Sequence, residues 1–139
     1  MEKIYSKIQP DVLLHIIDRA NDIDSTRKNI VGDNEFLQLA TMQLNSGHTF
    51  KAHKHIIHEK TTNIAQESWV IIKGSVRCVF YDLDDSIIAE PILYPGDCSI
   101  TLRGGHNYVI LEDGTKIREY KTGPYLGQEF DKTFLKEEK

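Results

Sequence analysis

From Phe36 onward the sequence is a succession of short runs rich in β-branched and aromatic residues, separated by turn residues. Such runs recur about every ten residues, and no helical pattern comes between them. The turns are marked by Asn45-Ser46-Gly47, Lys73-Gly74, Asp82 to Asp85, Pro95-Gly96-Asp97 and Asp113-Gly114. The pair Lys73-Gly74 indicates a hairpin between its two flanking strands. Repeated short strands of this kind are typical of a sandwich or barrel, so the sequence predicts an all-β fold.

The length of the chain fits one domain, because 139 residues can bury a core of their own. We expect three parts. Residues 1–34 form an N-terminal extension that packs on the barrel, residues 35–130 form the β-barrel, and residues 131–139 form a polar C-terminal tail. Within the extension, the stretch from Val12 to Ala20 is compatible with one or two helical turns or with an extra strand.

The charge of the chain argues against a nucleic-acid partner, since the net charge is −4 and the basic residues do not form a patch. The N-terminal apolar run is interrupted by His15 and is too short to span a bilayer. It also lacks a small-residue cleavage signal, and we therefore expect a cytoplasmic protein without a membrane partner. Cys78 and Cys98 lie in apolar stretches, which indicates buried free thiols.

Histidine is concentrated in one stretch, because four of the six histidines fall within residues 47–60: His48, His53, His55 and His58. On a strand, residues two apart share a face, so His53 and His55 would project together. Two imidazoles on an inward face are costly unless something satisfies them, and a metal ion would do so. His58 is then a candidate neighbour of the site, while alternation puts His48 on the opposite face.

The residues that follow extend this pattern. In order along the chain they are Gly47, His53-x-His55, Glu67, Gly74, Gly96 and His106. This order resembles the motifs of the cupin superfamily, and the resemblance covers roughly Leu39 to Tyr125. It implies a single-domain jelly-roll β-barrel or sandwich. It also implies a metal site of three histidines and one glutamate, which would be His53, His55, Glu67 and His106.

Two glutamates are candidates for the acidic ligand. The usual cupin spacing after His-x-His is short, and Glu59 fits it. Eleven residues separate His55 from Glu67, but Glu67 precedes Gly74 at the motif spacing and lies in a strongly β-patterned run. Alternation puts Glu67 on one face with Trp69 and Ile71, so we favour Glu67.

A closer resemblance comes from the segments HKH, QESWVIIKG, PGDCSIT, GGHNY and EYKTGPY. Together they resemble small bacterial cupins of the WbuC type, which are associated with surface-polysaccharide or sugar-nucleotide gene clusters. This resemblance implies a small polar ligand such as a sugar or sugar derivative. The candidate catalytic or substrate-contacting residues are Glu119, Lys121, Tyr108 and His58, of which Glu119 and Lys121 share one face of the last strand.

Three imidazoles and one carboxylate suit a divalent ion such as Fe, Mn, Ni, Co or Zn, and they leave coordination positions open. We therefore expect a metal-binding cupin that acts on a small polar metabolite by isomerisation, epimerisation or lyase chemistry. A non-haem iron dioxygenase and a non-catalytic small-molecule-binding cupin are the alternatives, so the sequence leaves open whether the protein is an enzyme. Exposed strand edges favour a homodimer.

Overall fold

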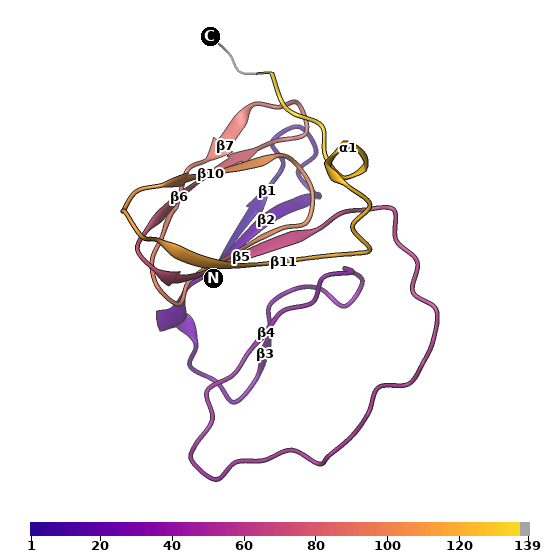
Figure 1. Cartoon of the computed structure of the whole chain (residues 1–139), viewed down its shortest axis with the longest axis vertical. Coiled ribbons are helices and arrows are strands. Elements are labelled where there is room, and N and C mark those ends of the chain that lie inside the picture. Colours follow the sequence, from indigo (N-terminus) through magenta and orange to yellow (C-terminus); the bar gives the residue numbers. More distant parts are fainter. Residues whose placement is uncertain (137–139) are drawn as a thin grey trace.

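The computed structural model describes residues 1–136, and the regular secondary structure of these residues is almost entirely antiparallel β-strand, joined by long irregular segments (Figure 1). The prediction of an all-β fold is confirmed. Two sheets pack face to face around a shared core. Within residues 1–136 the strand orders do not close into a barrel, because both sheets keep edge strands.

The larger sheet has five strands, all paired antiparallel. Their order across the sheet is β1 (Glu2–Tyr5), β2 (Leu13–Asp18), β9 (Cys98–Thr101), β5 (Glu67–Lys73) and β11 (Lys116–Lys121). The N-terminal part therefore supplies two strands of the main sheet, and the strand alternative for Val12 to Ala20 is correct. Side chains of β2 are buried on both of its faces, as in a sheet that is covered on both sides.

The smaller sheet has four strands, with β10 (His106–Ile110), β6 (Val76–Tyr81) and β7 (Ile87–Ala89) in that order and β8 (Ile92–Leu93) also paired with β6. Consecutive strands β5 and β6 thus belong to different sheets, so the hairpin predicted at Lys73-Gly74 is wrong. Gly74 has φ +80°, and a Cβ there would collide with Thr115. The glycine marks the point where the chain crosses from one sheet to the other.

The core between the sheets is formed by Ile17 and Ile71 from the larger sheet and by Val76, Cys78 and Phe80 from the smaller one. A second apolar cluster covers the outer face of the larger sheet. It joins Ile16, Ile100 and Leu102 to Ile30 and Val31, which follow β2 in the chain. Cys78 and Cys98 are buried and unpaired, as the sequence predicted.

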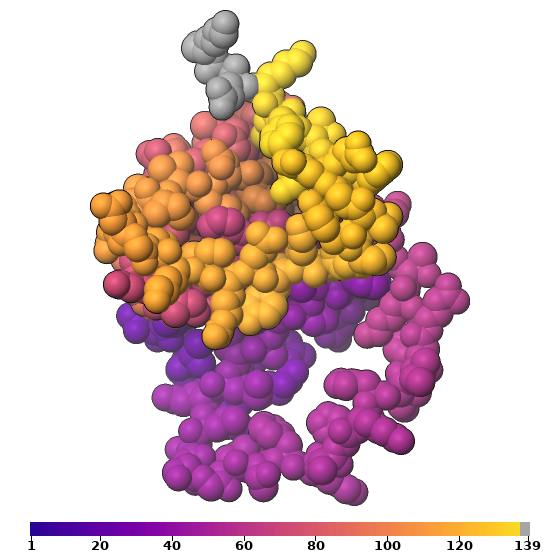
Figure 2. All heavy atoms as spheres, viewed as in Figure 1, coloured from indigo at the N-terminus to yellow at the C-terminus, as the bar shows by residue number. Residues whose placement is uncertain are grey.

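Residues 42–61 leave the body of the molecule as one long exposed segment, which we call the histidine loop. It starts after the short hairpin of β3 (Lys28–Asn29) and β4 (Ala40–Thr41), and every residue in it is exposed. Figure 2 shows the loop as an arch with open space between it and the rest of the chain. The strand predicted around His53 is absent here, because a strand needs a neighbour and residues 42–61 have none.

The remaining elements are short: the 3₁₀ turn η1 (Ala20–Asp22) and the helix α1 (Gln128–Asp131). Neither of these helices, the ones found in residues 1–136, is long and apolar enough to cross a membrane. Of the polar tail predicted for residues 131–139, Asp131 belongs to α1 and residues 137–139 lie outside the described part of the chain.

Candidate functional site

Glu67 and His106 meet at one end of the sandwich, with 3.3 Å between the Glu67 Oε1 and His106 Nε2 atoms. Glu67 begins β5 in the larger sheet and His106 begins β10 in the smaller one. The contact therefore joins the two sheets. Alternation along β5 also directs Trp69 and Ile71 to the interior, as the sequence predicted.

An aromatic stack lies beside this pair. The Trp69 and Tyr108 rings have centroids 3.8 Å apart and planes at 11°. Trp69 Nε1–H donates a hydrogen bond to Glu67 Oε1 at 2.8 Å, and the Tyr108 hydroxyl lies 3.0 Å from Ser99 Oγ. Burial raises the pKa of Tyr108, so its phenol is protonated at neutral pH.

Glu67 is held as a carboxylate. Burial would raise its pKa, but hydrogen bonding to His106, the charge of His106 and the Trp69 hydrogen bond outweigh burial and lower the pKa. Its side chain is 14 % exposed, and that of His106 is 26 % exposed. A carboxylate oxygen and an imidazole nitrogen thus lie close together in a partly buried position. Both atoms are of the kinds that bind divalent metal ions.

His15 is also buried, but both of its ring nitrogens have partners within the fold. Its Nδ1 is 3.1 Å from Thr101 Oγ1, its Nε2 is 3.2 Å from the Tyr81 carbonyl oxygen, and its ring stacks on Phe80. Burial lowers the pKa of His15 to about 4, so the ring is neutral. Because the carbonyl can only accept, Nε2 carries the proton and Nδ1 accepts from the Thr101 hydroxyl. Both ring nitrogens are used, which leaves none for a metal.

Lys121 and Glu119 share one face of β11, as the sequence predicted, and the pairing with β5 puts that face on the inner side. In the register of β11 and β5, Lys121 lies opposite Glu67 and Glu119 lies opposite Trp69. The Lys121 Nζ atom is 3.5 Å from a carboxylate oxygen of Glu119 and 3.5 Å from one of Asp131, and it lies over the Tyr125 ring. Asp131 comes from α1 and was not among the residues that the sequence pointed to.

The candidate metal ligands on the histidine loop do not join Glu67 and His106. His53 and His55 are exposed with ring centroids 5.6 Å apart, and His53 Nδ1 lies 2.9 Å from the Lys51 carbonyl oxygen. His58 and Glu59 are exposed on the same loop. Within residues 1–136 no three His, Cys, Asp or Glu side chains are grouped to hold a metal. The structure thus brings together two of the four expected ligands, and the other two are elsewhere.

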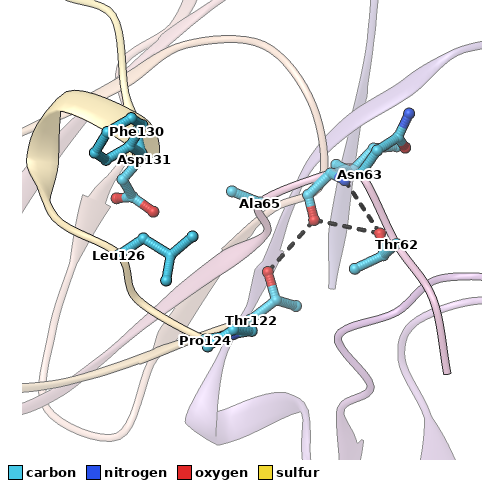
Figure 3. Close-up of a pocket in the computed structure, with 10 residues that line it drawn as sticks. Thr62, Asn63, Ala65, Thr122, Pro124, Leu126, Phe130 and Asp131 are labelled. Atoms are coloured by element: carbon cyan, nitrogen blue, oxygen red, sulfur yellow. Dashed lines mark hydrogen bonds between the residues drawn. The ribbon is translucent and has the colours of Figure 1, made fainter. Parts of the chain in front are cut away.

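A hollow of about 260 Å³ lies between residues 62–65 and the segment that follows β11. Asp131, the partner of Lys121, is one of the residues that line it. Figure 3 shows Asp131 and Phe130 on one side of it and Thr62 and Thr122 on the other. The Thr122 hydroxyl lies 3.4 Å from the Ile64 carbonyl oxygen, which fixes one wall. The hollow is large enough for a small polar molecule beside Lys121 and its partner Asp131.

Comparisons of the chain with protein-family models, with curated proteins and with solved structures found no match. The structure defines the class of protein as all-β, with two packed antiparallel sheets.

Proposed function

We propose that the protein is a cupin-like metal-binding protein that acts on a small polar metabolite, such as a sugar or sugar derivative. The metal would be a divalent ion held by His53, His55, Glu67 and His106. The observation that carries the proposal is the contact of Glu67 with His106. The sequence predicts both residues as ligands of one ion, and they lie 3.3 Å apart although they come from different sheets.

The length of this contact suits two ligands of one ion. Donor atoms bind a divalent transition metal at about 2.0–2.2 Å, so two donors at neighbouring positions lie about 3.0–3.5 Å apart. Because the pKa of Glu67 is lowered, its side chain is already a carboxylate and need not lose a proton when it binds a metal. The two-sheet sandwich is the arrangement from which a jelly roll is built, and this supports the resemblance without requiring a closed barrel.

The surrounding side chains suit a polar ligand. When bound, the metal would act as a Lewis acid on a ligand oxygen. The Lys121 ammonium offers hydrogen-bond donors and the Glu119 carboxylate offers acceptors on the same face. One edge of β11 has no strand partner within residues 1–136, and a homodimer that covers it is part of the proposal.

Metal analysis of protein purified without a histidine tag tests the proposal. We expect about one divalent ion per chain, and at least tenfold weaker binding of Ni²⁺ by Glu67→Gln and His106→Ala in calorimetry, since each removes a ligand. Glu90→Gln is the matched control, because Glu90 is an exposed carboxylate that pairs only loosely with Arg77. Binding of Ni²⁺ that is equal in all four proteins would contradict the proposed site.

A reaction is tested separately. Isomerase or epimerase chemistry moves a proton on carbon, so metal-loaded protein should introduce solvent deuterium into a sugar nucleotide. Oxygen uptake by the iron form would instead favour a dioxygenase. Metal binding without either reaction would favour a non-catalytic binding protein.

A further inference from the structure

The outer edge of β11 is open, and within residues 1–136 β11 is the longest of the edge strands (Figure 1). In this part of the chain it pairs only with β5, and no other backbone hydrogen bond involves its residues. Continuing the register of the pair, Thr122 N–H donates to the Gln66 carbonyl oxygen, so even-numbered residues face β5. The backbone groups of Ile117, Glu119 and Lys121 therefore point to the open edge.

Edge strands are usually protected against further pairing by shortness, by irregular register or by charge. β7 has three residues, and the register of β1 shifts between Ile4 and Tyr5. β11 is different, because it pairs regularly from Ile117 to Lys121. Its charged residues are of both signs, and such a mixture opposes some pairings of the edge while it favours others.

Most pairings of β11 with a second copy of itself bring like charges together. Two identical antiparallel strands are related by a two-fold axis, and the faces of the sheet match only when the axis passes through a residue. An axis at Ile117 would put Arg118 opposite Lys116. An axis at Arg118, Glu119 or Lys121 would put that residue opposite itself. Each of these four registers therefore has like charges at one pair, which is destabilising.

An axis at Tyr120 puts opposite charges together instead. Glu119 of each copy then lies opposite Lys121 of the other copy. The backbone groups of these two residues point to the open edge, so each such pair also exchanges its backbone hydrogen bonds. The two Tyr120 rings meet at the axis, and aromatic pairs across strands are favourable. Tyr120 is 53 % exposed in the single chain, so their contact covers exposed apolar surface.

An apolar hollow lies beside Tyr120 on the outer face of the larger sheet. It has a volume of about 360 Å³, and its apolar lining is formed by Leu37, Leu39, Val70, Ile100 and Tyr120. In a pair with the axis at Tyr120, the ring of the second copy extends the wall that the first ring gives to this hollow. The same register that matches the charges thus also matches apolar surface to apolar surface.

We propose that two copies of this chain pair antiparallel along β11 with the two-fold axis at Tyr120, so that their larger sheets become one continuous sheet. The inference rests on the proposed function, which includes a homodimer at this edge, and it names the contacts of that homodimer. Lys121 of the second copy lies opposite Glu119, whose other neighbour is Trp69 on β5. Each copy therefore supplies a lysine to the polar face beside the candidate site of the other.

A disulfide tests the register. Tyr120→Cys places two thiols at the axis, at a non-hydrogen-bonded pair with Cα atoms about 4.5 Å apart, which a disulfide can bridge. The matched control Arg118→Cys lies on the same face of the strand, but its two thiols are about 13 Å apart along the strands. With oxidised glutathione, we expect Tyr120→Cys to form a covalent dimer about tenfold faster than Arg118→Cys. Equal rates, or a faster rate for Arg118→Cys, overturn the inference.

Charge reversal tests the two ion pairs. Glu119→Lys alone puts lysine opposite lysine, and Lys121→Glu alone puts glutamate opposite glutamate, so each variant should dimerise about tenfold more weakly in sedimentation velocity. An equimolar mixture of the two variants has opposite charges at both pairs and should dimerise about as well as the unaltered protein. Glu129→Lys is the matched control, because Glu129 is exposed and lies outside β11. A mixture that stays monomeric, or a control that is weakened equally, contradicts the pairing.

The outcomes separate this inference from the proposed function. If the unaltered protein is a dimer but Tyr120→Cys cross-links no faster than Arg118→Cys, the register is wrong and the homodimer of the proposed function stands. If the unaltered protein is a monomer in sedimentation velocity, both are wrong. If Tyr120→Cys cross-links as expected and the protein binds no Ni²⁺, the pairing along β11 stands and the proposed metal site is wrong.

Discussion

The indole of Trp69 and the phenol of Tyr108 stack across the two sheets at 3.8 Å between ring centroids, directly beside the Glu67–His106 contact. The stack joins the larger sheet to the smaller one where the interior changes from apolar to polar. Tyr108 also packs against the core cluster of Ile71 and Phe80. The position of Glu67 thus depends on a hydrophobic contact as well as on its own hydrogen bonds.

Trp69→Leu should destabilise the fold by about 2–3 kcal/mol, because it removes the stack and leaves part of the space under Tyr108 empty. Trp69→Phe keeps an aromatic ring and loses the N–H bond to Glu67, so it should cost about 1 kcal/mol. Urea denaturation of both variants measures the difference. Equal losses would mean that the stack contributes little beyond the hydrogen bond.

His15 should make the protein less stable as the pH falls. Burial lowers the pKa of His15 from 6.5 to about 4, so the unfolded chain binds a proton at a pH where the folded chain does not. Stability is therefore full above pH 6.5 and decreases as the pH falls from there toward 4, by up to roughly 3 kcal/mol. His15→Gln does not titrate in this range.

We expect the variant to be less stable than the wild type at pH 7 but to show a flatter stability profile between pH 6.5 and 5, measured by urea denaturation in steps of pH. Carboxylates with lowered pKa values, such as Glu67, change the stability mainly at pH values below this range. A variant whose stability falls as steeply as that of the wild type would show that His15 is not the group responsible.

Local properties of the chain were predictable from the sequence. Alternation along single strands correctly put Glu67 with Trp69, His106 with Tyr108, and Glu119 with Lys121. Each of these relations needs only the two-residue period of a strand, which the sequence displays directly. The meeting of Glu67 with His106 followed from the resemblance to cupins, since spacing alone does not say which strands adjoin.

Relations between distant segments were not predictable from local sequence patterns. Lys73-Gly74 looks like a hairpin turn, but β5 finds its partners in β9 and β11. The choice of partner depends on which apolar faces fit together, and two residues at a turn do not encode it. The same limit applies to Asp131, whose contact with Lys121 depends on the path of the chain after β11. The histidine loop also lacks the sheet neighbour that its strand pattern assumed.

Gly74→Ala should destabilise the protein by about 2 kcal/mol or more. The residue has φ +80°, and an added Cβ would collide with the Thr115 side chain. Gly114→Ala is the matched control, because Gly114 has φ +70° but no atom within 4 Å of the added Cβ. The control should lose only about 1 kcal/mol through its backbone conformation. Thermal unfolding compares the two, and equal losses would mean that Thr115 moves aside at no cost.

Asp131 and Lys121 hold the segment that borders the hollow shown in Figure 3, and their pairing should be weak. The Lys121 Nζ and Asp131 Oδ2 atoms are 3.5 Å apart, and the side chains are 26 % and 18 % exposed. We expect a coupling free energy of about 0.5 kcal/mol in a double-mutant cycle of Lys121→Met and Asp131→Asn, decreasing further in 1 M salt. Lys121→Met should also lose the attraction to Glu119, which the cycle separates from the pair. A weak coupling means that a ligand carboxylate or hydroxyl can replace Asp131 at Lys121 with little loss of stability. A coupling above about 2 kcal/mol would instead make this contact a fixed part of the fold, closed to a ligand.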